Sequence, residues 1–105
     1  LLLFERLGVL DPELLETLAS NALVPAMSER DRALIDGVLA LVPEEIGNPT
    51  LAYNIACTWA LLEDRDRLLP AADAARQLGK PREQFLADPD FAAYTNEAEF
   101  LAAIE

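Results

Sequence analysis

A single cysteine and several groups of carboxylates are the residues of this chain that could take part in chemistry, and the chain contains no histidine. Cys57 could act as a nucleophile, but a thiol needs a neighbouring base to become a thiolate, and histidine is the usual one. Glu44 and Glu45 follow Pro43 and could share acid–base work if their surroundings gave them different roles. A solvated loop is the simpler interpretation of this pair. We therefore predict that the chain is not an enzyme.

Acidic residues near the C-terminus could form a cation site, namely Asp88, Asp90, Glu97 and Glu99. Their spacing lacks the central glycine and the ordered acids of a calcium-binding EF-hand loop. Pro89 directly after Asp88 is instead typical of a helix start, with the aspartate as N-cap. One cysteine also excludes an internal disulfide and a multi-cysteine metal site. We predict no metal and no cofactor, and we assign these acids to helix capping and to solvent.

The chain has 8 basic and 19 acidic residues, for a formal net charge of -11. This charge disfavours binding to nucleic acid and to anionic membrane surfaces, and no apolar run approaches the roughly 20 residues that span a bilayer. A basic protein partner is possible, although the charge could serve solubility alone. Cys57 sits in an apolar segment, which favours a buried thiol and a reducing, cytoplasmic location. The basic residues gather in one region, where they form surface ion pairs or mark a docking edge: Arg65, Arg67, Arg76, Lys80 and Arg82.

The 105 residues are 52% hydrophobic, and alanine and leucine supply much of that fraction. Both residues favour helices, so we predict a single all-α domain over residues 1–105 with about six to seven short helices. The first expected helix covers residues 1–7 and is ended by Gly8, and the second runs from Asp11-Pro12 to just before Pro25. The third is capped by Ser28 and ended by Pro43. The fourth is opened by Asn48-Pro49, and the fifth has Asp66 as its N-cap and Gly79 as its stop. Shorter helices follow in residues 81–86, after Asp88 and after Asn96.

Helical periodicity predicts the buried faces of the first long helices. In the second helix the expected stripe is Leu14, Leu15, Leu18, Ala22 and Leu23, and in the third it is Leu34, Ile35, Val38, Leu39 and Val42. Gly37 is either a weak point of the third helix or a place where another helix comes close.

Residues 51–80 resemble a tetratricopeptide repeat, a helix-turn-helix unit of 34 residues. Tyr53-Asn54-Ile55-Ala56 is similar to the Tyr-Asn-Leu-Gly/Ala stretch of the first helix of the repeat, and Asp64 matches the aspartate of its turn. Glu63 departs from the usual turn glycine, and Leu68 from the usual alanine. The resemblance implies packing roles between the helices for Ala56, Trp59, Ala72 and Ala75. It places Tyr53, Asn54, Cys57 and Leu61 on the concave groove, where a partner would bind.

The C-terminal segment is similar to the ending that follows the last unit of some bacterial repeat arrays, on the residues Asp88-Pro89-Asp90-Phe91-Ala92 and Asn96-Glu97-Ala98-Glu99-Phe100. The resemblance implies helix hairpins stacked in a right-handed array. Residues 1–48 would be N-terminal helices, possibly a decayed repeat, residues 49–80 the hairpin, and residues 81–105 a cap that lays aromatic side chains over the last repeat.

The function that this resemblance implies is a non-catalytic module for protein–protein interaction. In clamp-type relatives an asparagine at the place of Asn54 holds a peptide carboxylate, but the first helix here lacks the lysine or arginine of such a clamp. We expect Asn54 to bond neighbouring groups and Trp59 to belong to the core. The alternatives are an acidic inhibitor or immunity-type protein that blocks a basic partner, and a regulatory segment of a larger enzyme, which the missing initiator methionine suggests. A homo-oligomer through an exposed repeat face near Leu1-Leu2-Leu3-Phe4 is a further possibility.

Overall fold

The computed structural model describes residues 12–42 and 45–105, and every regular element in these two ranges is a helix. The elements are α2 (Pro12–Ser28), α3 (Arg32–Leu39), α4 (Pro49–Leu61), α5 (Arg65–Gln77), α6 (Arg82–Ala87), the 3₁₀ helix η1 (Pro89–Phe91) and α7 (Ala98–Ala103). The all-α fold predicted from composition is confirmed for this part of the chain. The expected helix over residues 1–7, its stop at Gly8 and the Asp11 cap lie outside the described residues, as do Pro43 and Glu44.

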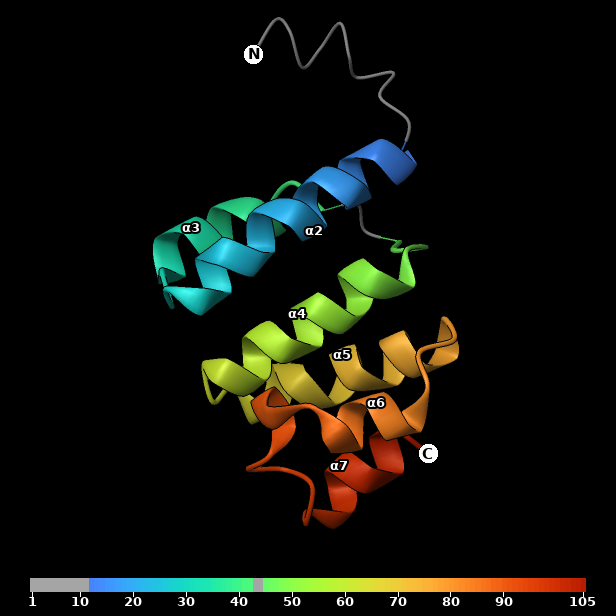
Figure 1. The fold of residues 1–105 in the computed structure, drawn as a ribbon. Coiled ribbons are helices and arrows are strands. Elements are labelled where there is room, and N and C mark those ends of the chain that lie inside the picture. The colour runs from blue at the N-terminus through green and yellow to red at the C-terminus, as the bar shows by residue number, and fades with distance from the viewer. Residues whose placement is uncertain (1–11, 43–44) are drawn as a thin grey trace, which may run out of the picture.

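The helices form layers along the long direction of the molecule (Figure 1). The antiparallel pair α2 and α3 makes one end, the antiparallel pair α4 and α5 lies in the middle, and α6, η1 and α7 make the other end. Sequential hairpins are therefore spatial neighbours, because each is joined to the next by a short connection. The short connection before α4 is tied back to α2 by the buried Glu16, whose carboxylate accepts a hydrogen bond from the Gly47 N–H at 2.6 Å.

Helix α4 is the shared wall of two hydrophobic clusters. On one side Leu51 packs with residues of α2 and α3, namely Ala19, Leu23, Ala26, Ile35 and Val38. On the other side α4 packs with α5 and the C-terminal segment, through a cluster that includes Ala56, Ala60, Leu68, Ala72, Phe85 and Phe100. A helix enclosed on both sides must be apolar nearly all round, which explains why the sequence of α4 carries no charged residue.

Helix α4 starts where the sequence predicted. Asn48 is the N-cap, and its side-chain oxygen accepts hydrogen bonds from the N–H groups of Thr50 at 2.8 Å and Leu51 at 3.2 Å. Pro49 occupies the first helical position, where its missing N–H costs nothing because that group has no intrahelical acceptor.

The end of α2 differs from the prediction. The helix passes through Pro25 and ends at Ser28, so Ser28 is not the N-cap of the next helix; Asp31 is, accepting from the Leu34 N–H at 3.1 Å. Leu23 and Ala26, which flank the proline, are both fully buried, and their packing holds the helix together across the missing hydrogen bond.

The N-cap of α5 is Asp64 rather than Asp66, since the Asp64 carboxylate accepts from the Arg67 N–H at 3.2 Å. The cap of α7 also moves by one residue, from Asn96 to Glu97, which makes no side-chain capping bond. The Asp88 cap is confirmed, because its carboxylate accepts from the Asp90 N–H at 2.9 Å.

Three helices end in the same hydrogen-bonded turn. In α4 the Asp64 N–H donates to the Trp59 carbonyl at 2.9 Å, and the Glu63 N–H donates to Ala60 at 3.2 Å. This pattern requires a left-handed residue after the helix, which is Glu63 with φ of 59°. The same turn uses Arg30 after α2 and Gly79 after α5, with φ of 53° and 112°. The sequence revealed the Gly79 stop, but no glycine marks the other two.

Candidate interaction site

The four residues assigned to helix packing lie where that role requires. Ala56, Ala72 and Ala75 are fully buried, and Trp59 is nearly so, all in the cluster between α4 and α5. Small side chains at these places let the two helix backbones approach closely. The Trp59 ring lies under two guanidinium groups, with the Cζ atoms of Arg67 and Arg32 at 4.8 and 5.5 Å from its centroid. Trp59 is thus a core residue, as expected, and two guanidinium groups lie over its ring.

The predicted concave groove is not open at its centre. Tyr53 is 5% exposed and Cys57 is 2% exposed, because α6 and η1 from the same chain cover this face of α4. Phe85 and Phe91 pack against the Tyr53 ring with centroid distances of 4.8 and 5.6 Å, and Lys80 Nζ lies 5.5 Å from the same centroid. Neither Tyr53 nor Cys57 therefore presents a surface to a partner, and the prediction that they line an accessible groove is wrong.

The Tyr53 hydroxyl forms a polar link from α4 to the C-terminal segment. It donates to the Asp88 Oδ2 atom at 2.6 Å and lies 3.2 Å from the Gln84 carbonyl oxygen. Burial raises the pKa of Tyr53 far above its usual value, and the hydrogen bond to Asp88 raises it further. Asp88 uses its other oxygen to cap η1, so a single carboxylate fixes both the start of η1 and its position on α4.

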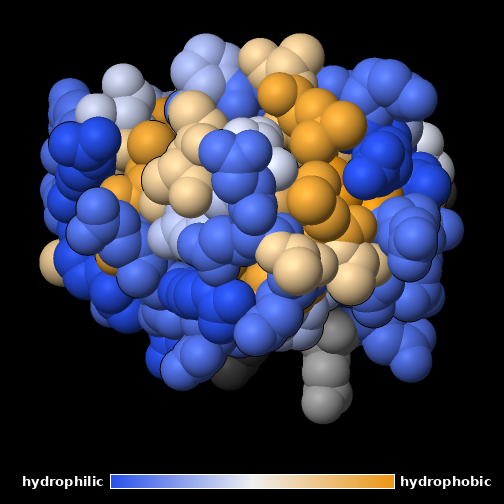
Figure 2. All heavy atoms as spheres, turned by 90° about the horizontal axis from the view of Figure 1, so that it is seen from below, coloured by the Kyte–Doolittle hydropathy of each residue, from blue (hydrophilic) through white to orange (hydrophobic). Residues whose placement is uncertain are grey.

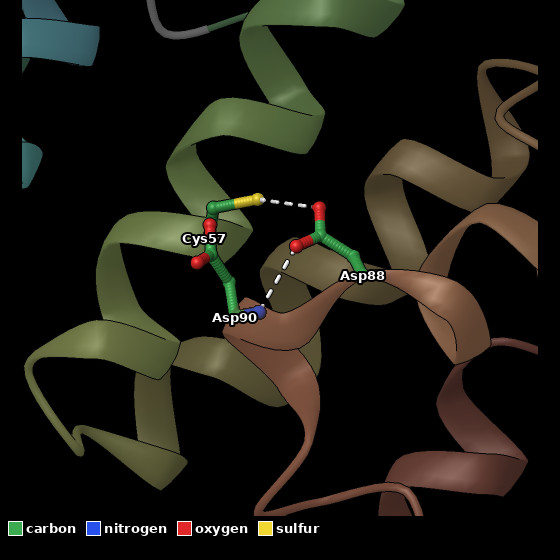
Figure 3. A group of neighbouring side chains, drawn as sticks. All are labelled: Cys57, Asp88 and Asp90. Atoms are coloured by element: carbon green, nitrogen blue, oxygen red, sulfur yellow. Dashed lines mark hydrogen bonds between the residues drawn. The ribbon is translucent and has the colours of Figure 1, made fainter.

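Cys57, Asp88 and Asp90 meet in one small cluster, shown in Figure 3, with their ligand-type atoms within 4.8 Å of one another. Cys57 Sγ lies 3.9 Å from Asp88 Oδ2. Burial raises the pKa of the Cys57 thiol well above its ordinary value, and the nearby Asp88 charge adds to the effect. Burial also raises the pKa of Asp90, and the negative charge of Asp88 raises it further.

The raised pKa of the Cys57 thiol disfavours the thiolate form that a nucleophile or a metal ligand needs. Both oxygens of Asp88 already accept hydrogen bonds from protein groups. The other two acids once grouped with these, Glu97 and Glu99, lie elsewhere and pair with Arg65 at 2.6 and 3.2 Å. The arrangement therefore favours a structural role for each of the four acids.

Asn54 and Leu61 are both partly exposed. The Asn54 amide donates to Ser20 Oγ at 2.8 Å and so joins α4 to α2, as expected for a residue that bonds its neighbours. Leu61 lies at the end of α4. Binding of a partner by these two residues stays a prediction.

Aromatic side chains form the base of the C-terminal layer. Phe85, Phe91, Tyr94 and Phe100 are buried, and Phe91 and Phe100 stack with centroids 5.5 Å apart. Arg76 holds the end of the chain by donating to the Ile104 carbonyl at 2.8 Å. Seen from this end, the surface is largely hydrophilic, although an area of hydrophobic side chains interrupts it (Figure 2).

An apolar groove at the opposite end of the molecule was not predicted. It has a volume of about 260 Å³ and is lined by Leu15, Leu18, Ala19, Ala22, Val38 and Leu41 of α2, α3 and the turn after α3. Leu18 is 53% exposed and Leu41 is 54% exposed, and Leu14 of α2 and Leu34 of α3 are nearly half exposed. The stripe that periodicity assigned to the core is thus divided: Leu23, Ile35 and Val38 are buried, whereas Leu14, Leu18 and Leu34 face outwards.

The sequence did carry a signal for this groove, namely an excess of apolar residues in α2. Helix α2 carries one apolar face with Ala19, Leu23 and Ala26 and another with Leu14, Leu18 and Ala22, more than one packed neighbour needs. Large exposed apolar patches on monomeric proteins commonly mark sites of interaction.

No helix among the described residues is long and apolar enough to cross a membrane. Comparison of the chain with protein-family models, with curated proteins and with solved structures gives no match in any of the three.

Proposed function

We propose that the chain is a non-catalytic protein-interaction module, similar in design to a tetratricopeptide repeat, which binds an apolar helix in the groove between α2 and α3. The observation that carries this proposal is the groove itself, with Leu18 and Leu41 more than half exposed at its edges. Two neighbouring helices that leave an apolar furrow between them suit an amphipathic helix, whose side chains at positions i, i+3, i+4 and i+7 fill such a furrow.

The polar groups near the centre of the molecule support binding rather than catalysis. The Cys57 thiol is buried with a raised pKa, and the chain has no histidine to activate it. Asp88 is held by Tyr53 and by the η1 backbone. The net charge of -11 disfavours nucleic acid as the ligand, and the buried thiol fits a reducing, cytoplasmic compartment.

The acidic-inhibitor alternative would use the C-terminal layer to bind a basic protein. Residues 81–105 contain six acids and one arginine. Glu97 and Glu99, however, are paired with Arg65, and Asp88 is engaged inside the molecule. The apolar groove is therefore the better-supported binding surface. A role as a segment of a larger enzyme is compatible with either surface.

Site-specific photo-crosslinking tests the proposal. A photoreactive amino acid at Leu18 of the full chain should capture one protein from an extract of the source organism, and that protein should then bind the purified chain. The Leu41→Glu substitution should weaken the binding roughly tenfold or more, because a charge in the groove must be desolvated. The matched control is the same photoreactive group at Leu86, which is 39% exposed on α6 at the other end of the molecule. Equal capture from both positions, or unchanged binding by the Leu41→Glu variant, would contradict the proposal.

A further inference from the structure

We infer that two copies of the chain associate through the outer face of α2, so that α2 of each copy fills the groove between α2 and α3 of the other. The occupant of the groove is therefore a second copy of this chain, held in a symmetric dimer. This inference goes beyond the proposed function, since it concerns what covers the groove when no other protein is bound.

The outer face of α2 carries both parts of a self-complementary surface. Leu14, Leu18 and Ala22 recur at every fourth position, so they share one face of the helix, and all three are exposed. Leu18 stands at the edge of the groove, whose lining includes the small side chains of Ala19 and Ala22. A two-fold symmetric interface needs a large side chain and a space for it on the same patch, because each residue of one copy meets a different residue of the other.

The positions of these residues along α2 suit an antiparallel pair of helices. Leu18 and Ala22 lie on either side of the midpoint of α2, which runs from Pro12 to Ser28. When two α2 helices pack antiparallel about that midpoint, Leu18 of each copy lies opposite Ala22 of the other, so a large side chain meets a small one twice. The stripe of α2 is also an apolar helix face of the kind that the groove suits.

The charge of the chain favours this face for self-association. With a net charge of -11, two copies repel each other wherever their acidic surfaces meet. Residues 17–28 contain no charged residue, and the only longer uncharged run, residues 46–62, includes the enclosed helix α4. Of the nearby acids, Glu16 is buried and Asp36 pairs with Arg32 at 3.2 Å.

The C-terminal layer offers no such surface, because residues 81–105 contain six acids and one arginine. This layer lies at the opposite end of the molecule from α2 (Figure 1). A dimer through α2 therefore keeps the two acidic layers apart and brings uncharged faces together.

Sedimentation of the purified full chain tests this inference in the absence of any other protein. A monomer–dimer equilibrium should appear over about a hundredfold range of protein concentration. Raising NaCl from about 50 to about 500 mM should lower the dissociation constant about threefold or more, because salt screens the repulsion between two acidic molecules. A monomer at every concentration, or a dimer that salt does not strengthen, would overturn the inference.

Two substitutions locate the interface. Leu18→Glu should raise the dissociation constant of the dimer about tenfold or more, since it places two like charges in an apolar contact. Leu86→Glu makes the same change at a 39% exposed leucine of α6, at the other end of the molecule, and should change the constant by less than about threefold. Equal effects of the two substitutions would show that the copies do not meet at α2.

Cysteine crosslinking provides a second readout that adds no charge. In the Leu18→Cys variant a short bismaleimide should link two copies, whereas the Leu86→Cys control should give about a tenth of that product or less. The natural Cys57 is buried and should stay unmodified in the folded chain. Equal yields from the two variants would overturn the inference even if Leu18→Glu failed to fold.

The dimer and the proposed function can fail independently. Self-association is measured on the purified chain alone, whereas the proposed function requires capture of a different protein from Leu18. Where both hold, a partner helix must displace the second copy, so the apparent affinity for the partner should fall as the concentration of the chain rises.

Discussion

At the scale of single residues, one carboxylate contacts several polar groups in the interior of the described structure. Asp88 accepts hydrogen bonds from the Tyr53 hydroxyl and from the Asp90 backbone, and it lies next to the Cys57 thiol. The sequence predicted the capping bond, because Asp-Pro is a local signal. It could not predict the bond to Tyr53, since 35 residues separate the two partners.

This cluster predicts a loss of stability at alkaline pH. The ordinary pKa values are 9.0 for Cys57 and 10.0 for Tyr53, and both are raised in the folded chain. Above these ordinary values the unfolded chain releases protons that the folded chain retains. The free energy of unfolding is therefore undiminished below about pH 9 and then falls by up to about 1.4 kcal/mol per pH unit for each group. Urea unfolding between pH 8 and pH 11 measures the decline.

The Tyr53→Phe variant separates the contribution of Tyr53 to this decline from that of Cys57. It loses the hydrogen bond to Asp88 and should be less stable at pH 7 by about 1.5–3 kcal/mol, as expected for a bond to a charged acceptor. Above pH 10 its stability should decline less steeply than that of the natural chain. A decline of equal steepness in both proteins would show that Tyr53 does not retain its proton.

At the scale of helices, the ends of each element depend on particular side chains, and these are open to direct tests. Asn48 caps α4 with two hydrogen bonds, whereas Asn96, which the sequence also suggested as a cap, lies one residue before the N-cap of α7. The two asparagines therefore form a matched pair.

Substitution of Asn48 by alanine should lower the free energy of unfolding by about 1 kcal/mol, because two N–H groups at the start of α4 lose their acceptor. Substitution of Asn96 by alanine should change it by less than about 0.5 kcal/mol. Thermal or urea unfolding of both variants provides the comparison, and equal losses would contradict the capping assignment.

Two glycines should respond to alanine in opposite directions. Gly37 lies in the exposed part of α3, and an added Cβ would meet no atom within 4 Å, so Gly37→Ala should stabilise the chain by about 0.5–1 kcal/mol. Gly79 also has open space, but its φ of 112° is strained for any other residue, so Gly79→Ala should destabilise by more than about 1 kcal/mol. Unfolding midpoints of the two variants in urea give the signs, and a loss of stability in Gly37→Ala would mean that α3 has a closer neighbour there.

At the scale of the whole molecule, α4 joins two clusters that differ in how completely they are covered. The C-terminal layer closes the α4–α5 side with buried aromatic rings, whereas the α2–α3 side leaves an apolar groove open among the described residues. The two ends of the molecule should therefore respond differently to substitution of large apolar side chains.

The Phe100→Ala substitution should cost about 3–5 kcal/mol, because the ring is fully buried between Phe91 and its other aromatic neighbours. Leu86→Ala is the matched control in the same layer and should cost less than about 1 kcal/mol, since Leu86 is 39% exposed. The fluorescence of Trp59 during urea unfolding reports both values. A small loss in Phe100→Ala would show that the C-terminal layer is not part of the core.

The sequence by itself determined the helical class and the local helix signals, including the starts at Pro12, Asn48-Pro49 and Asp88-Pro89 and the stop at Gly79. These features depend on a few neighbouring residues and on their backbone preferences, so they can be predicted from the sequence alone. The turns that end α2 and α4 were harder to predict, because their hydrogen bonds impose a left-handed conformation on Arg30 and Glu63, which do not prefer it.

Only the tertiary structure decided which apolar faces are covered. A stripe at helical spacing looks the same whether it meets the core, another segment or solvent, so Leu18 and Leu23 were indistinguishable in the sequence and differ completely in exposure. For the same reason Tyr53 and Cys57 were assigned to an open groove, although α6 and η1 cover them, and the groove between α2 and α3 escaped prediction. Exposure is a property of what packs against a residue, and those contacts join segments that lie far apart along the chain.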